Sequence, residues 1–355
     1  MLAARLMGWR STGMGNRMRR WVAGAFILLV LAVPGCAQTP GAAEPAVSPA
    51  VQDPDLPAGW RWESYGGVEV GIPGDWGWGN GSQRLSQWCV ATPEQIAKPI
   101  VGRPGGTTLA GCGVAGKGRP DTLIANTGSV VAFDRTTAGP GAEEHGDQSA
   151  VRLDGVEVTV NAPPELRHRI VATIRRVAEV DSFGCPTTHS ISDRPDQRPA
   201  KPASLSDVTS VSACKYPVGH SSAPKPRLIS SLRLDGAAAD QAIRAVAEAP
   251  RGGGPDNPDQ CMPSVSYGDD VIVLLVRSAA GRTEIVLRYS GCDHNGFDDG
   301  ISVRKLTVEA VAPFIARSNG MYGGFSGGPE KLAVLDPEAA RQMPSSAPVP
   351  NPATS

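Results

Sequence analysis

Alternating apolar and polar residues mark several strands in the first half of the chain. Val68–Ile72 and Val156–Val160 show a period of two, which is typical of strands with one buried face. Ser129–Phe133 and Ala150–Leu153 have the same pattern. Asp154-Gly155, between two of these runs, predicts a hairpin turn.

A helical pattern follows these strands. Apolar residues recur at steps of three and four between Leu166 and Val177, so the sequence predicts an amphipathic helix over Pro164–Val180 that begins at a proline. Strands followed by a closing helix indicate an α+β domain, which we place at residues 57–181.

The second half repeats this mixture of elements and predicts a second α+β domain over residues 182–318. The expected strands and helices are Ser210–Tyr216, Leu228–Leu234, Asp270–Arg277, Thr283–Tyr289 and Ile301–Arg304 for strands, with Ala237–Ala249 and Thr307–Ala316 for helices. The fold class is therefore α+β, with two small disulfide-stabilised domains, each built from antiparallel strands with one or two packed helices. Residues 319–355 are rich in Gly, Ser and Pro and predict a disordered tail with at most a short helix.

Residues 1–35 have the pattern of an export signal. Arg17, Arg19 and Arg20 precede the apolar run Val22–Val33, and no acidic residue occurs among them. This run is too short to span a membrane as a mature helix, and small residues follow it.

A possible lipid-attachment site follows the apolar run. Val33-Pro34-Gly35-Cys36 resembles the lipobox of bacterial lipoproteins, and the resemblance implies that Cys36 is lipidated and becomes the first residue. Residues 36–56, rich in Ala, Pro and acidic side chains, would then form a disordered tether to the outer face of the cytoplasmic membrane. The alternative is ordinary cleavage after Ala37, which would discard Cys36 and release a secreted protein.

The charge of the exported part argues against some partners. The chain has 34 basic and 35 acidic residues, but five arginines and no acids lie in residues 1–35. The part from Cys36 onward therefore carries 29 basic and 35 acidic groups, a net charge of about −6. Nucleic acids and anionic lipids attract a positive surface, so we expect no nucleic-acid partner.

Six cysteines remain after Cys36, and an even number in an exported chain indicates disulfides. They are Cys89, Cys112, Cys185, Cys214, Cys261 and Cys292. The sequence does not choose among the possible pairings, although sequential pairing would keep each pair within one segment. No CxxC motif or close Cys/His cluster supports a zinc site.

Two short motifs match catalytic or phosphate-binding patterns by spelling alone. GCGVAGKG at 111–118 lacks the Ser or Thr that completes a phosphate loop, because Gly118 stands there and Pro120 follows where a helix should begin. GFSGG at 324–328 matches a nucleophile elbow but has no strand before it. The five histidines also show no arrangement with a nucleophile and an acid, so we predict no catalytic residue and no cofactor.

The loop CDHNGFDDG at 292–300 offers oxygen ligands. Asp293, Asn295, Asp298 and Asp299 have the side chains that calcium prefers, although their spacing is not that of an EF-hand. Asn-Gly and Asp-Gly are also ordinary turn signals. A calcium site and a disulfide-pinned turn therefore remain as two interpretations.

Five of the seven tryptophans lie between Trp60 and Trp88. They could form a stacking platform for sugars, or they could supply the core of a small β-rich domain. Trp60/Trp62 and Trp76/Trp78 are each two residues apart, so each pair shares one face of an extended backbone.

Several segments resemble exported proteins and lipoproteins of high-GC Gram-positive bacteria for which no activity is established. They are YGGVEV (65–70) with DWG (75–77), KPIVGRPG (98–105), and YSGC (289–292) with NG (295–296) and DDG (298–300). The resemblance covers both predicted domains and implies no site residue. The resulting hypothesis is a lipid-anchored binding module of the cell envelope, with an envelope protein, a peptide or a glycan as partner; a secreted or anchored cell-wall hydrolase is the alternative.

Overall fold

The computed structural model describes residues 56–78, 99–103, 129–146, 148–202, 205–218, 227–320, 329–337 and 341. Residues 1–35, Cys36, Cys89, Cys112 and the motifs at 111–118 and 324–328 lie outside this set. The described residues all belong to one compact unit. Within it, the two predicted domains correspond to separate sheets, so the α+β class is confirmed and the division into two domains is matched only loosely.

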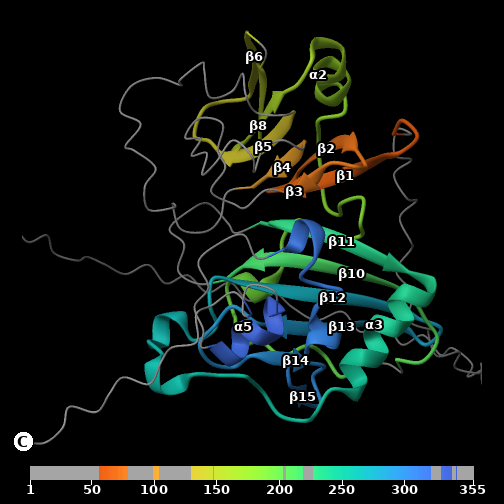
Figure 1. The fold of residues 1–355 in the computed structure, drawn as a ribbon, viewed down its shortest axis with the longest axis vertical. Helices are drawn as coiled ribbons and strands as arrows, with labels where there is room; N and C mark the ends of the chain where they lie inside the picture. The colour runs from red at the N-terminus through yellow and green to blue at the C-terminus, as the bar shows by residue number, and fades with distance from the viewer. Residues whose placement is uncertain are drawn as a thin grey trace, which may run out of the picture. The chain divides into compact units, whose positions relative to one another are not determined.

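A three-stranded antiparallel sheet opens the described chain (Figure 1). It has the order β1 (Trp60–Tyr65), β2 (Val68–Pro73) and β9 (Arg175–Arg176). Gly66 and Gly67 join β1 to β2 with φ angles of 62° and 88°, which favour glycine.

A six-stranded sheet completes the first half of the fold. Its order is β3-β4-β5-β8-β7-β6. The strands are β3 (Gly77–Trp78), β4 (Ile100–Gly102), β5 (Val130–Arg135), β6 (Gly141–His145), β7 (Gln148–Leu153) and β8 (Val156–Asn161). The β3/β4 and β4/β5 pairs are parallel, so the prediction of purely antiparallel strands was wrong here. Long connections between these strands allow the crossovers that parallel pairing requires.

The predicted hairpin turn is confirmed, whereas the following helix is shorter than predicted. Asp154 and Gly155 have φ angles of 49° and 80° and join β7 to β8. Helix α2 covers Pro164–Val171 only. The chain leaves the helix because the Thr173 hydroxyl accepts a hydrogen bond from Gly71 N at 2.8 Å and β9 pairs with β2. Tertiary pairing therefore overrides the helical periodicity.

The second half is built on a six-stranded antiparallel sheet, hereafter the large sheet, with the order β11-β10-β12-β13-β14-β15. Its strands are β10 (Val208–Pro217), β11 (Ser230–Asp235), β12 (Asp270–Ser278), β13 (Gly281–Arg288), β14 (Gly296–Asp298) and β15 (Val303–Arg304). The helices are α3 (Gly236–Glu248), α4 (Val308–Val311) and α5 (Pro329–Leu335), and the short 3-10 helices are η3 (Ser190–Ser192), η4 (Pro258–Gln260), η5 (Pro263–Val265) and η6 (Arg317–Asn319).

The helices pack against one face of the large sheet (Figure 1). Ala242 and Val246 of α3, with Phe314 after α4, join apolar strand residues in the largest buried cluster. α4 is much shorter than the predicted helix at 307–316, and α5 lies in the segment predicted to be a disordered tail. Leu335 of α5 is buried in this cluster, which explains why the helix forms.

The opposite face of the large sheet is also covered. Cys185 and Ile191, from the segment before β10, pack there against Tyr216 and Val273. The segment that contains Cys185 and Ile191 therefore covers part of this face of the large sheet.

Candidate functional site

The predicted calcium ligands do not converge. Asp298 is 2% exposed, and its carboxylate accepts two hydrogen bonds from Arg198, at 2.8 Å to Oδ1 and 3.0 Å to Oδ2. Arg288 lies 3.4 Å from Oδ2 on the other side. These two guanidinium groups already satisfy the carboxylate that a cation would need.

The other three candidates hold turns together. The Asn295 amide donates to Asp256 Oδ1 at 2.6 Å. Asp299 Oδ1 accepts hydrogen bonds from the backbone N–H groups of Ile301 and Ser302. Asp293 Oδ1 accepts one from the backbone N–H of the next residue, His294. In the part of the chain that the structure describes, no group of three or more His, Cys, Asp or Glu side chains could hold a metal ion. The geometry thus supports the turn interpretation of this loop.

The described tryptophans belong to the packed interior or are covered by arginines. Trp76 is buried in the core of the first half, where Trp60 and Trp78 also pack in part. Glu63 accepts a 2.8 Å hydrogen bond from the Trp78 indole. A guanidinium lies against each of the other rings, at 4.9 Å for Arg169 on Trp60, 4.0 Å for Arg175 on Trp62 and 4.1 Å for Arg61 on Trp78. This arrangement supports the core interpretation, because sugars stack on bare ring faces.

The described histidine side chains make contacts that stabilise the fold. His189 Nδ1 accepts a hydrogen bond from Ile191 N at 3.1 Å, and its Nε2 lies 3.7 Å from Glu284 Oε2. His294 stacks on Tyr267 with ring centroids 4.5 Å apart. His168 is exposed, and its Nε2 lies 3.9 Å from Glu144 Oε1. Because Nδ1 of His189 is already an acceptor, its imidazole serves to hold the segment at 189–193.

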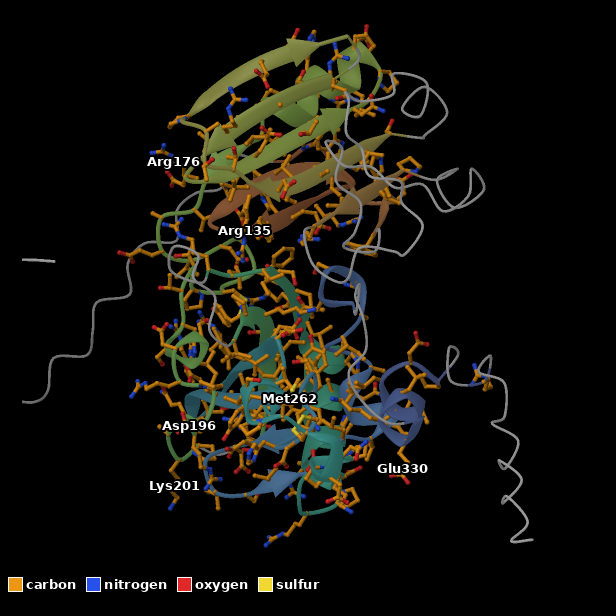
Figure 2. The ribbon with its side chains drawn as sticks, turned by 90° about the vertical axis from the view of Figure 1, so that its left-hand side faces the viewer. Arg135, Arg176, Asp196, Lys201, Met262 and Glu330 are labelled. Atoms are coloured by element: carbon orange, nitrogen blue, oxygen red, sulfur yellow. A yellow bond between two sulfur atoms is a disulfide. The ribbon has the colours of Figure 1, made fainter. Side chains whose placement is uncertain are left out.

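Two of the three sequential cysteine pairs are present as disulfides. Cys185–Cys214 and Cys261–Cys292 each have Cα atoms 5.5 Å apart, while Cys89 and Cys112 lie outside the described residues. The first disulfide is fully buried. The second lies near the surface, since Cys261 is partly exposed and the side chain of the next residue, Met262, projects outward (Figure 2).

A buried cluster of lysine, aspartate and tyrosine lies at one end of the helix-covered face of the large sheet. Lys215 Nζ is 3.3 Å from Asp270 Oδ2 and 5.8 Å from the centre of the Tyr289 ring. Lys331 of α5 donates to the carbonyl of Gly291 and is 3% exposed. Burial lowers the pKa of Lys331 to about 8, although Asp256 and Asp270 oppose that shift.

A second buried cluster, hereafter the carboxylate seam, was not foreseen from the sequence. It contains Glu69 of β2 and Asp181, which follows β9, with Ser64, Ser182 and Ser231 around them. Glu69 is 1% exposed. Its Oε2 accepts from Arg175 at 2.9 Å and from the Ser182 hydroxyl at 3.0 Å.

Asp181 has a different set of partners. Its Oδ1 accepts from the backbone N–H groups of Phe183 and Cys185 at 3.0 and 2.8 Å, and its Oδ2 accepts from the Ser231 hydroxyl. Burial raises the pKa of Asp181 to about 6. The hydrogen bonds from Ser231 and Cys185 oppose this rise, and the charge of Glu69 adds to it.

The sequence offered one signal for this seam. Val68, Val70 and Ile72 of β2 face the core as their alternation predicts, which puts Glu69 on the other face. That face is buried as well, by Arg175 and Ser182, which are more than 100 residues away in the sequence.

The described surface also has a small apolar cavity of about 50 Å³ beside α3. Leu205, Val246, Ile285 and Phe297 line it, together with the charged residues Asp299 and Arg304. A volume of this size holds one or two water molecules and is too small for a metabolite.

Comparisons with known proteins return no relative: no family model, curated protein or solved structure matches this chain. Among the described residues, no helix combines the length and apolar character needed to cross a bilayer.

Proposed function

We propose that this chain is a lipid-anchored binding module on the outer face of the cytoplasmic membrane. The observation that carries the proposal is the pair of disulfides in a chain whose first 35 residues have the pattern of an export signal. Disulfides form and persist in oxidising compartments, which is where an exported lipoprotein resides. Two acyl chains on Cys36 would hold the folded part at the membrane through the tether at 36–56.

The partner that we favour is an envelope protein or peptide. Three of the described tryptophan rings carry an arginine on one face, so they are poor candidates for stacking on a glycan. The acidic balance from Cys36 onward, with 29 basic and 35 acidic groups, disfavours a polyanionic partner.

Metabolic labelling with an alkyne fatty acid in a Gram-positive host tests the anchor. The wild-type chain should take up the label and sediment with membranes, and Cys36→Ser should lose both properties. The matched control is Cys261→Ser/Cys292→Ser, which keeps Cys36 and should remain labelled. Unlabelled wild-type protein in the culture medium would support cleavage after Ala37 and overturn the lipid anchor.

Binding is tested separately by photo-crosslinking in intact cells, followed by mass spectrometry of the crosslinked bands. A reproducible protein or peptide adduct that requires the folded chain supports the proposal. A chain that crosslinks to no protein but is retained on purified peptidoglycan would contradict the choice of partner.

A further inference from the structure

The carboxylate seam contains two buried acids with unequal compensation. Arg175 bonds to Glu69 through both Nε and a terminal nitrogen, at 3.1 and 2.9 Å, so that carboxylate has a cationic partner. Asp181 is 5% exposed, and its hydrogen-bond donors among the described residues are two backbone amides and serine hydroxyls, all of them neutral. Burying a charged carboxylate without a cation is unfavourable, even where hydrogen bonds are good.

The charged and titratable groups around Asp181 do not supply that cation. Glu69 of β2 adds a second negative charge, which Arg175 of β9 neutralises. On β10, the Tyr216 phenol donates to the carbonyl of Pro186. Burial raises the pKa of this phenol further above its usual value, so it stays neutral. Arg233 of β11 pairs with Asp235 at 2.8 Å. A proton is therefore the simplest species that can neutralise Asp181.

Asp181 also joins three parts of the fold. Its Oδ1 holds the turn that leads into the Cys185–Cys214 disulfide, its Oδ2 meets Ser231 of β11, and Ser64 of β1 lies within reach of both acids. A change in its charge therefore acts on the contact between the three-stranded sheet, this turn and the large sheet.

We propose that Asp181 is an acid-strengthened latch, which binds a proton at mildly acidic pH and thereby tightens the seam between β2, the 181–185 turn and β11. In the protonated form one oxygen becomes a donor to the Ser231 hydroxyl, while Oδ1 keeps accepting from Phe183 and Cys185. This response to pH is independent of the anchor and the partner proposed above.

The sign of the effect follows from proton linkage. The folded-state pKa of Asp181 is raised to about 6 from 3.8, so the stability that protonation contributes is fully present below pH 3.8 and is lost as the pH rises through about 6. The shift corresponds to an increase of about 100-fold in the unfolding equilibrium constant over this window.

Carbon-13 titration of the aspartate carboxyls in the purified wild-type chain tests the latch at the site itself. We expect the Asp181 resonance to titrate near pH 6, and amide exchange at Phe183 and Cys185, corrected for intrinsic rates, to be slower at pH 5 than at pH 7.5. An Asp181 midpoint below pH 4.5, or equal protection at the two pH values, would overturn the proposal.

Urea unfolding of Asp181→Asn provides the second test, with Asp298→Asn as the matched control. Both residues are buried aspartates, but Asp298 is bonded to Arg198 and Arg288, and its pKa is lowered although burial opposes ionisation. Asp181→Asn should remove the loss of stability between pH 4 and pH 7, and Asp298→Asn should leave it in place. An Asp181→Asn curve parallel to that of the wild type would refute the latch.

Discussion

Removing the two described disulfides one at a time separates the contribution of loop closure to the free energy of unfolding from the contribution of burial. The pairs Cys185–Cys214 and Cys261–Cys292 close loops of nearly equal length, with sequence separations of 29 and 31. In the chain-entropy account, loops of this size each contribute about 4 kcal/mol to the free energy of unfolding. Loop length alone therefore predicts almost the same loss for the two double alanine variants.

Burial distinguishes the two disulfides. Cys185 and Cys214 are both 0% exposed and pack with Tyr216, Leu228 and Val273. Replacing these sulfur atoms with hydrogen leaves a void in the core, which adds about 1–2 kcal/mol to the cost. Cys261 is partly exposed, so its surroundings can relax or admit water. We expect Cys185→Ala/Cys214→Ala to lose about 5–6 kcal/mol and Cys261→Ala/Cys292→Ala about 4 kcal/mol.

Urea unfolding at pH 7, followed by circular dichroism, measures both values, and thiol labelling during mild reduction gives an independent order. The surface pair should be reduced first because a thiolate must reach a sulfur atom to attack it. A larger loss for the Cys261–Cys292 variant, or earlier reduction of Cys185–Cys214, would refute the reasoning from burial.

The remaining predictions concern a glycine and a buried lysine. A Cβ at Gly268 would overlap the hydroxyl and backbone of Ser290, so Gly268→Ala should lower the free energy of unfolding in urea by about 3 kcal/mol or more. Gly146 also has a positive φ but no neighbour within 4 Å, so Gly146→Ala should lower it by about 1 kcal/mol. Similar losses for the two variants would contradict the close approach at Gly268. Since burial lowers the pKa of Lys331 to about 8 from 10.5, wild-type stability should rise between pH 8 and pH 10, and Lys331→Met should remove that rise. If the stability of Lys331→Met still rises between pH 8 and pH 10, another group titrates in this range and the assignment to Lys331 is wrong.

Period-two patterns predicted strands well wherever one face of the strand is apolar. β2, β5, β7 and β8 all appear at the expected places. The strands that were missed include β6 (Gly141–His145) and β14 (Gly296–Asp298), which are short and lack alternation. Their formation depends on pairing with β7 and β13, which a local pattern does not report.

Helix ends were predicted less well for a related reason. The periodicity from Leu166 to Val177 is real, but Glu69 binds Arg175 and the backbone of Gly71 binds Thr173, which draws the chain into β9 after Val171. Residues far apart in sequence make these contacts, so the periodicity alone could not show them.

The carboxylate seam illustrates the same limit for the candidate site. Glu69 was visible as the polar residue of an alternating strand, and Asp181 as an ordinary acid after a predicted helix. Only the packing of β2, the 181–185 turn and β11 buries both of them. The predicted calcium ligands show the same limit. Asp298 pairs with Arg198, which lies 100 residues earlier, and no local pattern in the sequence indicates this pairing.

The most direct test of the account is the intact mass of the protein isolated from its own envelope in mild detergent. The account predicts a chain that begins at Cys36, carries the mass of a diacylglyceryl group, and lacks two hydrogens for each of the disulfides Cys185–Cys214 and Cys261–Cys292. A chain that retains residues 1–35 with unmodified Cys36 and free thiols would contradict both export and anchoring.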